Sequence, residues 1–270
     1  MTERTEGLQS IRRALRLARL VAETQRRGAR VTDLACYANL NVATASRILR
    51  GLTEERLLRF DERTRSYRVG PLAYELGLAA RGELRIRERW TPLLQRIAAE
   101  TGETTYLIAQ SDIDAVCLAS VAGSGPIRAV LFEVGDRIPL GIGAGSLALL
   151  AQLTDPEVNE ILEANSNLAD AFGEHASVSA MQTAVAVTRR VGYAYTHDLW
   201  APGDRTRALV AAGVGLAIPP ERTTTIPLAV SIAFVAGGGA EAEHSRFATT
   251  MRQAMQEFSG ATFSRRSGLC

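Results

Sequence analysis

The chain has 270 residues, of which 46% are apolar and 22% charged. This is the composition of a folded protein of about two domains and excludes a disordered or fibrous chain. Three scattered cysteines and three histidines predict neither a disulfide framework nor a metal site, and we expect no cofactor. No apolar stretch reaches the roughly 18 residues of a membrane span, and no signal peptide opens the chain, so we expect a cytoplasmic protein that contacts no membrane.

The net charge of +2 hides an asymmetry. Residues 1–90 carry 19 Arg against 11 Asp and Glu, whereas the remaining residues carry 12 against 18. All 31 basic residues are arginine, whose planar five-donor group suits phosphates and base edges, although genome composition explains the same bias equally well. The charge pattern predicts a basic module followed by an acidic one.

Apolar residues at steps of three and four predict a basic amphipathic helix at the N-terminus. Its predicted apolar face consists of Leu8, Ile11, Leu15, Ala18 and Ala22, and Arg12, Arg13, Arg16 and Arg19 cover the other faces.

Two further helices are predicted next. Thr32 and Asp33 offer side-chain oxygens to cap a short helix that ends near Ala38. Asn39 tolerates the left-handed backbone conformation of a tight turn, and Asn41 can cap a third helix that runs to about Glu55.

The third predicted helix has one polar face, which points away from the core and carries Ala43, Ser46, Arg47 and Arg50. Two short strands with a basic tip at residues 62–66 follow. Three helices and a two-stranded ribbon form a winged helix-turn-helix, in which the third helix enters the major groove of DNA.

Arg can pair with guanine, and Ser and Thr can contact base edges or phosphates. The candidate DNA-binding residues are therefore Thr32, Asn41, Ala43, Thr44, Ser46, Arg47 and Arg50, with Arg63 and Arg65 of the wing as phosphate contacts. A basic exposed face also occurs as plain solvated surface, but its place inside a complete winged motif favours DNA binding.

The stretches "VTDLACYANLNVATASRILRGLTEERLL" and "YRVGPLAYELG" resemble the DNA-binding domain of the isocitrate lyase regulator (IclR) family of bacterial transcription factors. The stretches "LLQRIAAETGETTYL", "VGDRIPLGIGAGSLALLA" and "GYAYTHD" resemble the effector domain of that family, and the similarity spans residues 8 to 258. Two positions depart from the family pattern: Asn39 replaces a usual glycine, and Ser146 stands where a lysine is frequent.

The predicted organisation is α+β, with a winged helix-turn-helix domain at residues 1–71, a linker helix at 72–90, an α/β domain at 91–258 and a tail at 259–270. The resemblance implies that the α/β domain is GAF-like, with an antiparallel sheet, and that the linker helps to pair two DNA-binding domains. A solvated spacer is the alternative for the linker. In the α/β domain the patterns predict three strands between Thr105 and Phe132, three helices between Ser146 and Val191, three strands between Tyr193 and Phe234 and a final helix at 240–258.

The segment "GIGAGS" at residues 141–146 precedes a predicted helix, where free backbone N–H groups and the helix dipole favour an anion. A tight strand-to-helix turn explains these glycines equally well. The resemblance implies that Gly143, Ala144 and Gly145 bind the carboxylate of a small organic or aromatic acid. It also places further residues around that effector, namely Ile127, Arg128, Ala129, Asp198, Ala208, Leu209, Ser231 and Ala233.

The sequence therefore predicts a transcriptional regulator that acts as a repressor, binds double-stranded operator DNA as a homodimer or homotetramer, and responds to a small organic acid. The rival hypotheses are an enzyme with an accessory DNA-binding domain and a ligand-independent DNA-architectural protein. His197 and Asp198 raise the possibility of a hydrolase, but no serine stands in a G-x-S-x-G motif, so we expect no catalysis.

Overall fold

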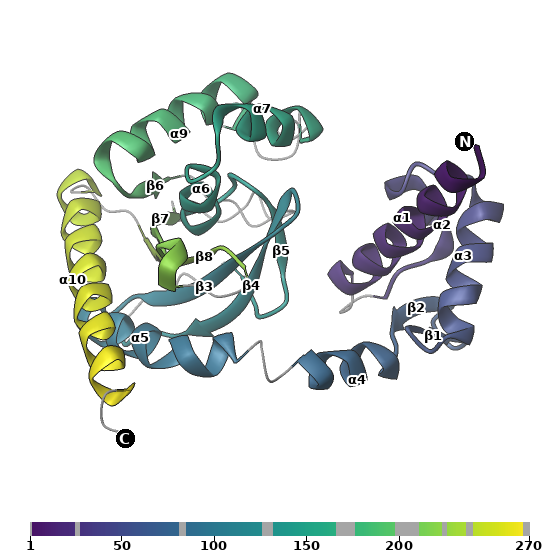
Figure 1. Cartoon of the computed structure of the whole chain (residues 1–270), viewed down its shortest axis with the longest axis horizontal. Helices are drawn as coiled ribbons and strands as arrows, with labels where there is room; N and C mark the ends of the chain where they lie inside the picture. The colour runs from purple at the N-terminus through teal and green to yellow at the C-terminus, as the bar shows by residue number, and fades with distance from the viewer. Residues whose placement is uncertain are drawn as a thin grey trace. The chain divides into compact units, whose positions relative to one another are not determined.

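The computed structural model divides the chain into two compact units, Met1–Leu84 and Arg85–Cys270 (Figure 1). It describes residues 2–24, 28–80, 85–125, 132–165, 176–197, 211–222, 226–235 and 240–266. Within these ranges, no helix is long and apolar enough to cross a membrane.

The first unit is a winged helix-turn-helix, as predicted. Strands β1 and β2 pair antiparallel, with Leu58 opposite Val69 and Asp61 opposite Ser66. The elements in chain order are α1 (Thr2–Glu23), α2 (Val31–Tyr37), α3 (Val42–Glu54), β1 (Leu58–Asp61), β2 (Ser66–Val69) and α4 (Pro71–Ala79).

Helix α1 buries a different face from the one predicted. Leu17 and Val21 are fully buried against α2 and α3, whereas Leu8, Ile11 and Leu15 are about half exposed, at 50%, 58% and 49%. Both stripes have helical spacing, so periodicity alone cannot tell which one packs on the core.

The turn and the third helix form as their asparagines indicate. Asn39 adopts a left-handed conformation with φ 53°, and the Asn41 side chain accepts a hydrogen bond of 2.7 Å from the Thr44 backbone N–H. The predicted cap of the second helix is wrong. Helix α2 begins at Val31, after Arg30, so Thr32 lies inside the first turn and caps nothing.

The pattern predicts a linker helix at 72–90 that continues into, or is kinked before, a helix from about Thr91 to Glu100, whereas the structure has two separate helices that divide this stretch differently. Helix α4 ends at Ala79 and buries none of its residues, and α5 (Ile86–Thr101) begins the second unit. The boundary between the units, Leu84 to Arg85, therefore falls inside the predicted linker rather than at its end.

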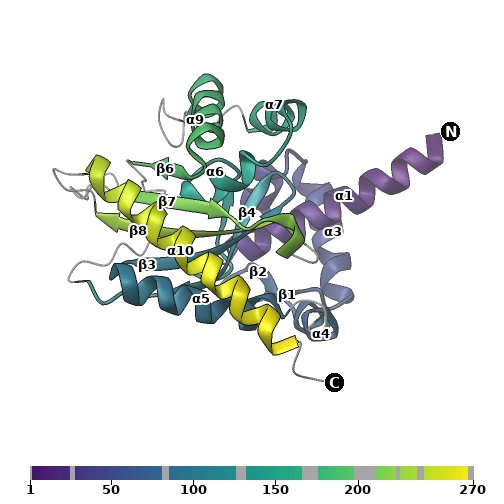
Figure 2. The same cartoon turned by 60° about the vertical axis from the view of Figure 1, so that its left-hand side comes forward.

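The second unit is a three-layer α/β domain, built on a six-stranded antiparallel sheet of order β5-β4-β3-β8-β7-β6. Helices α5 and α10 cover one face, and α6, α7 and α9 lie on the other (Figure 1); Figure 2 shows α10 crossing its face of the sheet. The remaining elements are β3 (Thr104–Ser111), β4 (Asp114–Val121), β5 (Arg137–Pro139), α6 (Ala144–Leu150), α7 (Asp155–Ala164), α9 (Val178–Val191), β6 (Ala194–Thr196), β7 (Ala211–Ala217), the 3-10 turn η3 (Pro220–Arg222), β8 (Leu228–Val235) and α10 (Ala240–Arg266).

The central strands are apolar on both faces because helices cover both sides of the sheet. In β3, Tyr106 and Ile108 belong to the core under α6, α7 and α9, whereas Leu107 and Ala109 belong to the core under α5 and α10. Alternate residues of one strand thus serve two separate cores.

Three details differ from the sequence-based prediction. Helix α10 continues to Arg266, so residues 259–266 are helical rather than a tail. Strand β5 was not predicted, since it has only three residues and ends in proline. Of the predicted strand at 127–132, only Phe132 lies within the described residues, and it is not in a strand.

Candidate nucleic-acid interface and small-molecule cavity

The exposed face of α3 carries the side chains predicted to read DNA. Ala43, Arg47 and Arg50 are exposed and Ser46 is half-buried, while Ala45 and Leu49 on the opposite face are fully buried. The core therefore orients the helix so that its polar face points outward. Thr44 is half-buried beside the Asn41 cap, and Thr32 is exposed on α2.

The wing tip is held by Asp61, whose carboxylate accepts hydrogen bonds from the backbone N–H groups of Arg63 and Thr64 at 3.0 and 3.2 Å. These hydrogen bonds lower the pKa of the Asp61 carboxyl group, and the bond from the Thr64 backbone has the largest effect. The same turn leaves the side chains of Arg63 and Arg65 exposed at the tip. The wing thus presents two cations beside the helix-turn-helix, suited to phosphate contacts.

A small, partly enclosed cavity lies between the start of α6 and the sheet; we call it the α6 cavity. One wall consists of small residues from α6 and strands β7 and β8, namely Gly143, Ala144, Gly145, Ser146, Gly213, Ser231 and Ala233. The other wall is apolar and includes Tyr106, Ile108, Phe132 and Ile138. The space open to the centre of a water molecule is about 10 Å³, close to what one water molecule needs.

The predicted residues Gly143, Ala144 and Gly145 of the glycine-rich segment and Ser231 and Ala233 of β8 therefore line one cavity. The first helical residues of α6 have backbone N–H groups with no partner inside the helix, which gives this wall donors for an anion.

Helix α6 is seated on the sheet through glycine. A Cβ atom built on Gly215 would lie 2.2 Å from the Ala144 carbonyl oxygen, and one on Gly145 would lie 2.9 Å from Ser231 Oγ. Each position excludes a side chain because another part of the chain fills its place. This close approach of backbone to strand is what positions the small-residue wall.

Ser146 has a structural role at this position. It is fully buried, and its hydroxyl accepts a hydrogen bond from the Gly141 N–H at 3.1 Å and donates to the Ile142 carbonyl oxygen at 2.5 Å. The hydroxyl thereby closes the loop that precedes α6.

Six residues implied by the resemblance lie outside the described residues, namely Ile127, Arg128, Ala129, Asp198, Ala208 and Leu209. Sequence reasoning also missed seven residues that line the cavity, among them Tyr106, Phe132 and Gly213. Tyr106 and Phe132 gave no signal beyond their hydrophobicity, and their ring centroids lie 6.1 Å apart in an edge-to-face arrangement. Gly213 did give one, because glycines alternate in "AAGVGLA" and so share one face of a strand.

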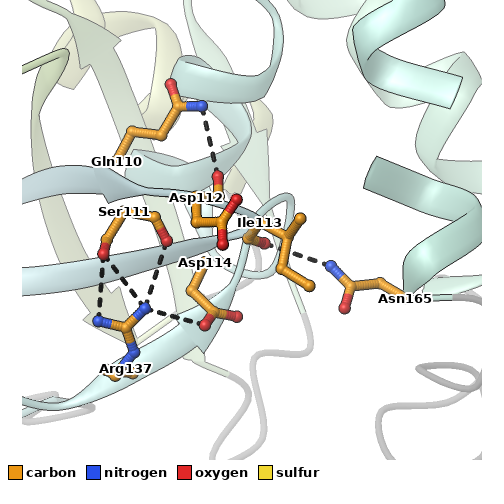
Figure 3. A network of polar contacts seen from close by, with 7 residues as sticks. All are labelled: Gln110, Ser111, Asp112, Ile113, Asp114, Arg137 and Asn165. Carbon is orange, nitrogen blue, oxygen red and sulfur yellow. Dashed lines mark hydrogen bonds and ion pairs between the residues drawn. The ribbon is translucent and has the colours of Figure 1, made fainter. Parts of the chain in front are cut away.

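A polar network ties the turn between β3 and β4 to its neighbours (Figure 3). The Arg137 guanidinium of β5 donates to Ser111 Oγ at 3.2 Å, to the Ser111 carbonyl oxygen at 3.3 Å and to Asp114 Oδ2 at 3.0 Å. Asn165, which follows α7, donates to the carbonyl oxygen of Ile113 in the same turn at 3.3 Å. The network holds β5, whose central residue lines the α6 cavity.

Little in the described part of the chain resembles catalytic machinery. No group of three or more His, Cys, Asp or Glu within it is arranged to hold a metal ion. Burial raises the pKa of the Cys117 thiol to about 12, which keeps it protonated and unreactive at neutral pH.

A winged helix-turn-helix unit with an exposed basic reading face, followed by an α/β unit with an internal cavity, defines the class of single-chain DNA-binding regulators. The comparisons with known proteins agree. The model of the bacterial transcriptional regulator IclR C-terminal domain matches residues 79–259, and that of the IclR helix-turn-helix domain matches residues 10–62. The chain belongs to the IclR family of bacterial transcriptional regulators, as the sequence motifs indicated.

Individual proteins show the same likeness. The transcriptional repressor IclR of Escherichia coli (strain K12) is 27% identical over 209 residues, which cover 76% of this chain and 74% of that protein. The IclR family transcriptional regulator from Brucella abortus has the same fold, with a TM-score of 0.71 at 20% identity over 94% of this chain and 92% of that one. An IclR homologue from Microbacterium hydrocarbonoxydans, solved in complex with 4-hydroxybenzoate, has a TM-score of 0.61 at 21% identity over 93% and 99% of the two chains.

Proposed function

We propose that this regulator is a repressor that binds double-stranded operator DNA through α3 and the wing, and that a small organic or aromatic acid in the α6 cavity changes its operator affinity. The single observation that carries the DNA-binding half is the outward face of α3, where Arg47 and Arg50 are exposed and Ser46 is half-buried. The repressor role is supported by the E. coli relative, which is named a transcriptional repressor. Because a bacterial chromosome lies in the cytoplasm, we propose that the protein acts there.

The side chains of α3 have complementary tasks at an operator. Arg47 and Arg50 can each donate two hydrogen bonds to one guanine, and the small Ala43 leaves room for a thymine methyl group. The wing arginines, with the exposed arginines of α1, supply sequence-independent attraction to phosphates. Since one recognition helix covers only a few base pairs, we propose that a homodimer or homotetramer binds a two-fold-related site.

The effector half rests on the chemistry of the α6 cavity. Backbone N–H groups at the start of α6 and the Ser231 hydroxyl form a polar wall for a carboxylate, and Tyr106 and Phe132 form an apolar wall for a ring or alkyl group. The complex of the Microbacterium homologue with 4-hydroxybenzoate supports an aromatic acid as one candidate. Because the cavity has room for only about one water molecule, its walls must open to admit such a ligand.

The DNA-binding half is tested by mobility shift on an operator selected from random sequences. Arg47→Ala and Arg50→Ala should each weaken operator binding by about 1–3 kcal/mol while weakening binding to scrambled DNA much less. Arg190→Ala is the matched control, since it removes the same charge from an exposed position in the other unit. Equal loss on both DNA sequences would assign the two arginines to phosphates instead of bases.

The effector half is tested by thermal-shift screening of carboxylic acids against their methyl esters. A bound acid at 100 times its dissociation constant adds about 2.7 kcal/mol to the stability of the unit. The acid should bind more tightly than its ester, because charge-assisted hydrogen bonds are roughly twice as strong as neutral ones. Equal binding of acid and ester would contradict an anion site at α6.

A further inference from the structure

Thr104, the first residue of β3, has a buried hydroxyl group that lacks a hydrogen-bond partner among the described residues. The residue is 3% exposed, and none of the described residues forms a hydrogen bond with its Oγ1. A buried hydroxyl without a partner destabilises the fold, and most such groups are paired. An unpaired one therefore needs an explanation, and a ligand that completes the pair is one.

The strand register places Thr104 beside the α6 cavity. Thr104 lies opposite Ala233 of β8, and Ala233 lies opposite Gly213 of β7, so these three residues form one row across the sheet. Ala233 and Gly213 both line the cavity. Because directly opposed Cβ atoms lie about 4.5–5.5 Å apart, the Thr104 side chain is a neighbour of the cavity wall.

The next row contains the polar wall described above. Tyr106 of β3 and Gly215 of β7 both lie opposite Ser231, and the start of α6 packs on Gly215 and Ser231. Since residues two apart in a strand share a face, Thr104, Tyr106 and Ser231 point to the same side of the sheet. Two hydroxyl groups on adjacent rows thus lie on the α6 side of the sheet.

The adjacent residue, Thr105, differs from Thr104 because its hydroxyl group has a hydrogen-bond partner. Thr105 is fully buried on the opposite face of the strand, and its hydroxyl donates to the Glu103 carbonyl oxygen at 3.4 Å. The backbone before Thr104 is also fixed, since Gly125 donates to the Gly102 carbonyl oxygen at 2.9 Å. Thr104 therefore lies on the cavity side by strand geometry, and its hydroxyl, unlike that of Thr105, has no hydrogen-bond partner among the described residues.

We propose that Thr104 is an effector-contacting, specificity-determining residue. Its hydroxyl forms a hydrogen bond with a second oxygen, hydroxyl or keto, of an organic acid whose carboxylate lies at the start of α6. This inference rests on the proposed effector function of the α6 cavity. The ligand class is thereby narrowed from carboxylic acids in general to oxygen-substituted carboxylic acids.

The test uses the whole 270-residue chain in isothermal titration with two matched pairs of acids, benzoate with 4-hydroxybenzoate and propionate with lactate. The variant Thr104→Val keeps the shape of the side chain and removes the hydroxyl, Thr104→Ser keeps the hydroxyl, and Thr105→Val is the neighbouring control. In at least one pair, the wild type should bind the hydroxylated acid more tightly than its parent. Thr104→Val should lose about five- to tenfold of its affinity for that hydroxylated acid and none for the parent, whereas Thr104→Ser and Thr105→Val should bind like the wild type.

A thermal melt without ligand is a second readout, because it separates an effector-contacting threonine from one that stabilises the fold. Thr104→Val should melt at or above the wild-type temperature, because it removes an unpaired buried hydroxyl, whereas Thr105→Val should melt lower. Three results for Thr104→Val would overturn the inference: a lower melting temperature, an equal loss of affinity for both members of a pair, or no loss of affinity for either. Each of them would leave the proposed effector function unaffected. If the wild type binds none of the four acids, the effector function of the cavity fails with these probes, and the inference fails with it.

Discussion

Gly215 of β7 offers the sharpest test of how the sheet holds α6. In Gly215→Ala the added methyl group would lie 2.2 Å from the Ala144 carbonyl oxygen, 2.4 Å from the Ala144 carbonyl carbon and 2.8 Å from the Gly145 nitrogen. All three are backbone atoms, so no rotamer change can relieve the contact. Favourable contacts between carbon atoms are about 3.5–4.0 Å long, so the first turn of α6 must retreat by about 1 Å or more.

The expected cost follows from that displacement. Inserting a methyl group into a packed interior typically costs about 1–3 kcal/mol, and a backbone obstacle places this site at the upper end. For a unit of this size each kcal/mol lowers the melting temperature by about 2–4 °C, so we expect a decrease of about 4–12 °C. Because the displaced turn forms the small-residue wall of the α6 cavity, acid binding should be lost as well.

Scanning calorimetry of the full chain measures the melting temperature, and isothermal titration measures acid binding. The matched control is Gly192→Ala at the end of α9, where the glycine has φ 77° and an added Cβ atom meets only the Arg252 side chain at 3.5 Å. That variant should lose about 1 kcal/mol from backbone strain and should bind acid normally. A Gly215→Ala variant that melts and binds like the wild type would refute the seating of α6 on β7.

Three further changes test local features. Asn41→Ala removes the cap of α3 and should lower the free energy of unfolding of the first unit by about 1 kcal/mol, measured by urea denaturation; an unchanged value would mean that the cap is dispensable. Arg137→Ala removes the bonds to the β3–β4 turn and leaves the carboxylate of Asp114 without this partner, which should cost about 1–3 kcal/mol and weaken acid binding; Arg190→Ala should do neither. Burial raises the pKa of Cys117 from its ordinary 9.0 to about 12, so the thiol stabilises the fold fully below pH 9 and progressively less as the pH rises towards 12. The stability difference between wild type and Cys117→Ala should therefore shrink above pH 9, and a constant difference in urea denaturation would contradict this.

Local chemistry explains what the sequence predicted well. Asn39 and Asn41 indicated the turn and the start of α3 because each acts on its own backbone within three residues. Helix α7 is one of the three helices predicted between Ser146 and Val191, and a capping box joins Thr154 and Glu157 at its start. The polar face of α3, and with it the candidate DNA-reading residues, followed from helical periodicity alone.

The α6 cavity could be anticipated only in part. The glycine cluster at 141–146 marked one wall, and the family resemblance supplied Ser231 and Ala233. Tyr106 and Phe132 could not be assigned to it, because apolar residues in strands look alike whether they line a cavity or fill a core.

Local signals were sufficient to predict the helix-turn-helix and the polar face of α3, because caps, turns and periodicity act over a few residues. They did not reveal which stripe of α1 is buried, that β7 brings Gly215 against the start of α6, or that Thr104 shares a row with Ala233 and Gly213. Those outcomes depend on strand register and on helix packing between residues far apart in the chain. Such contacts are selected by the shape of the whole core, which a pattern within one segment does not encode.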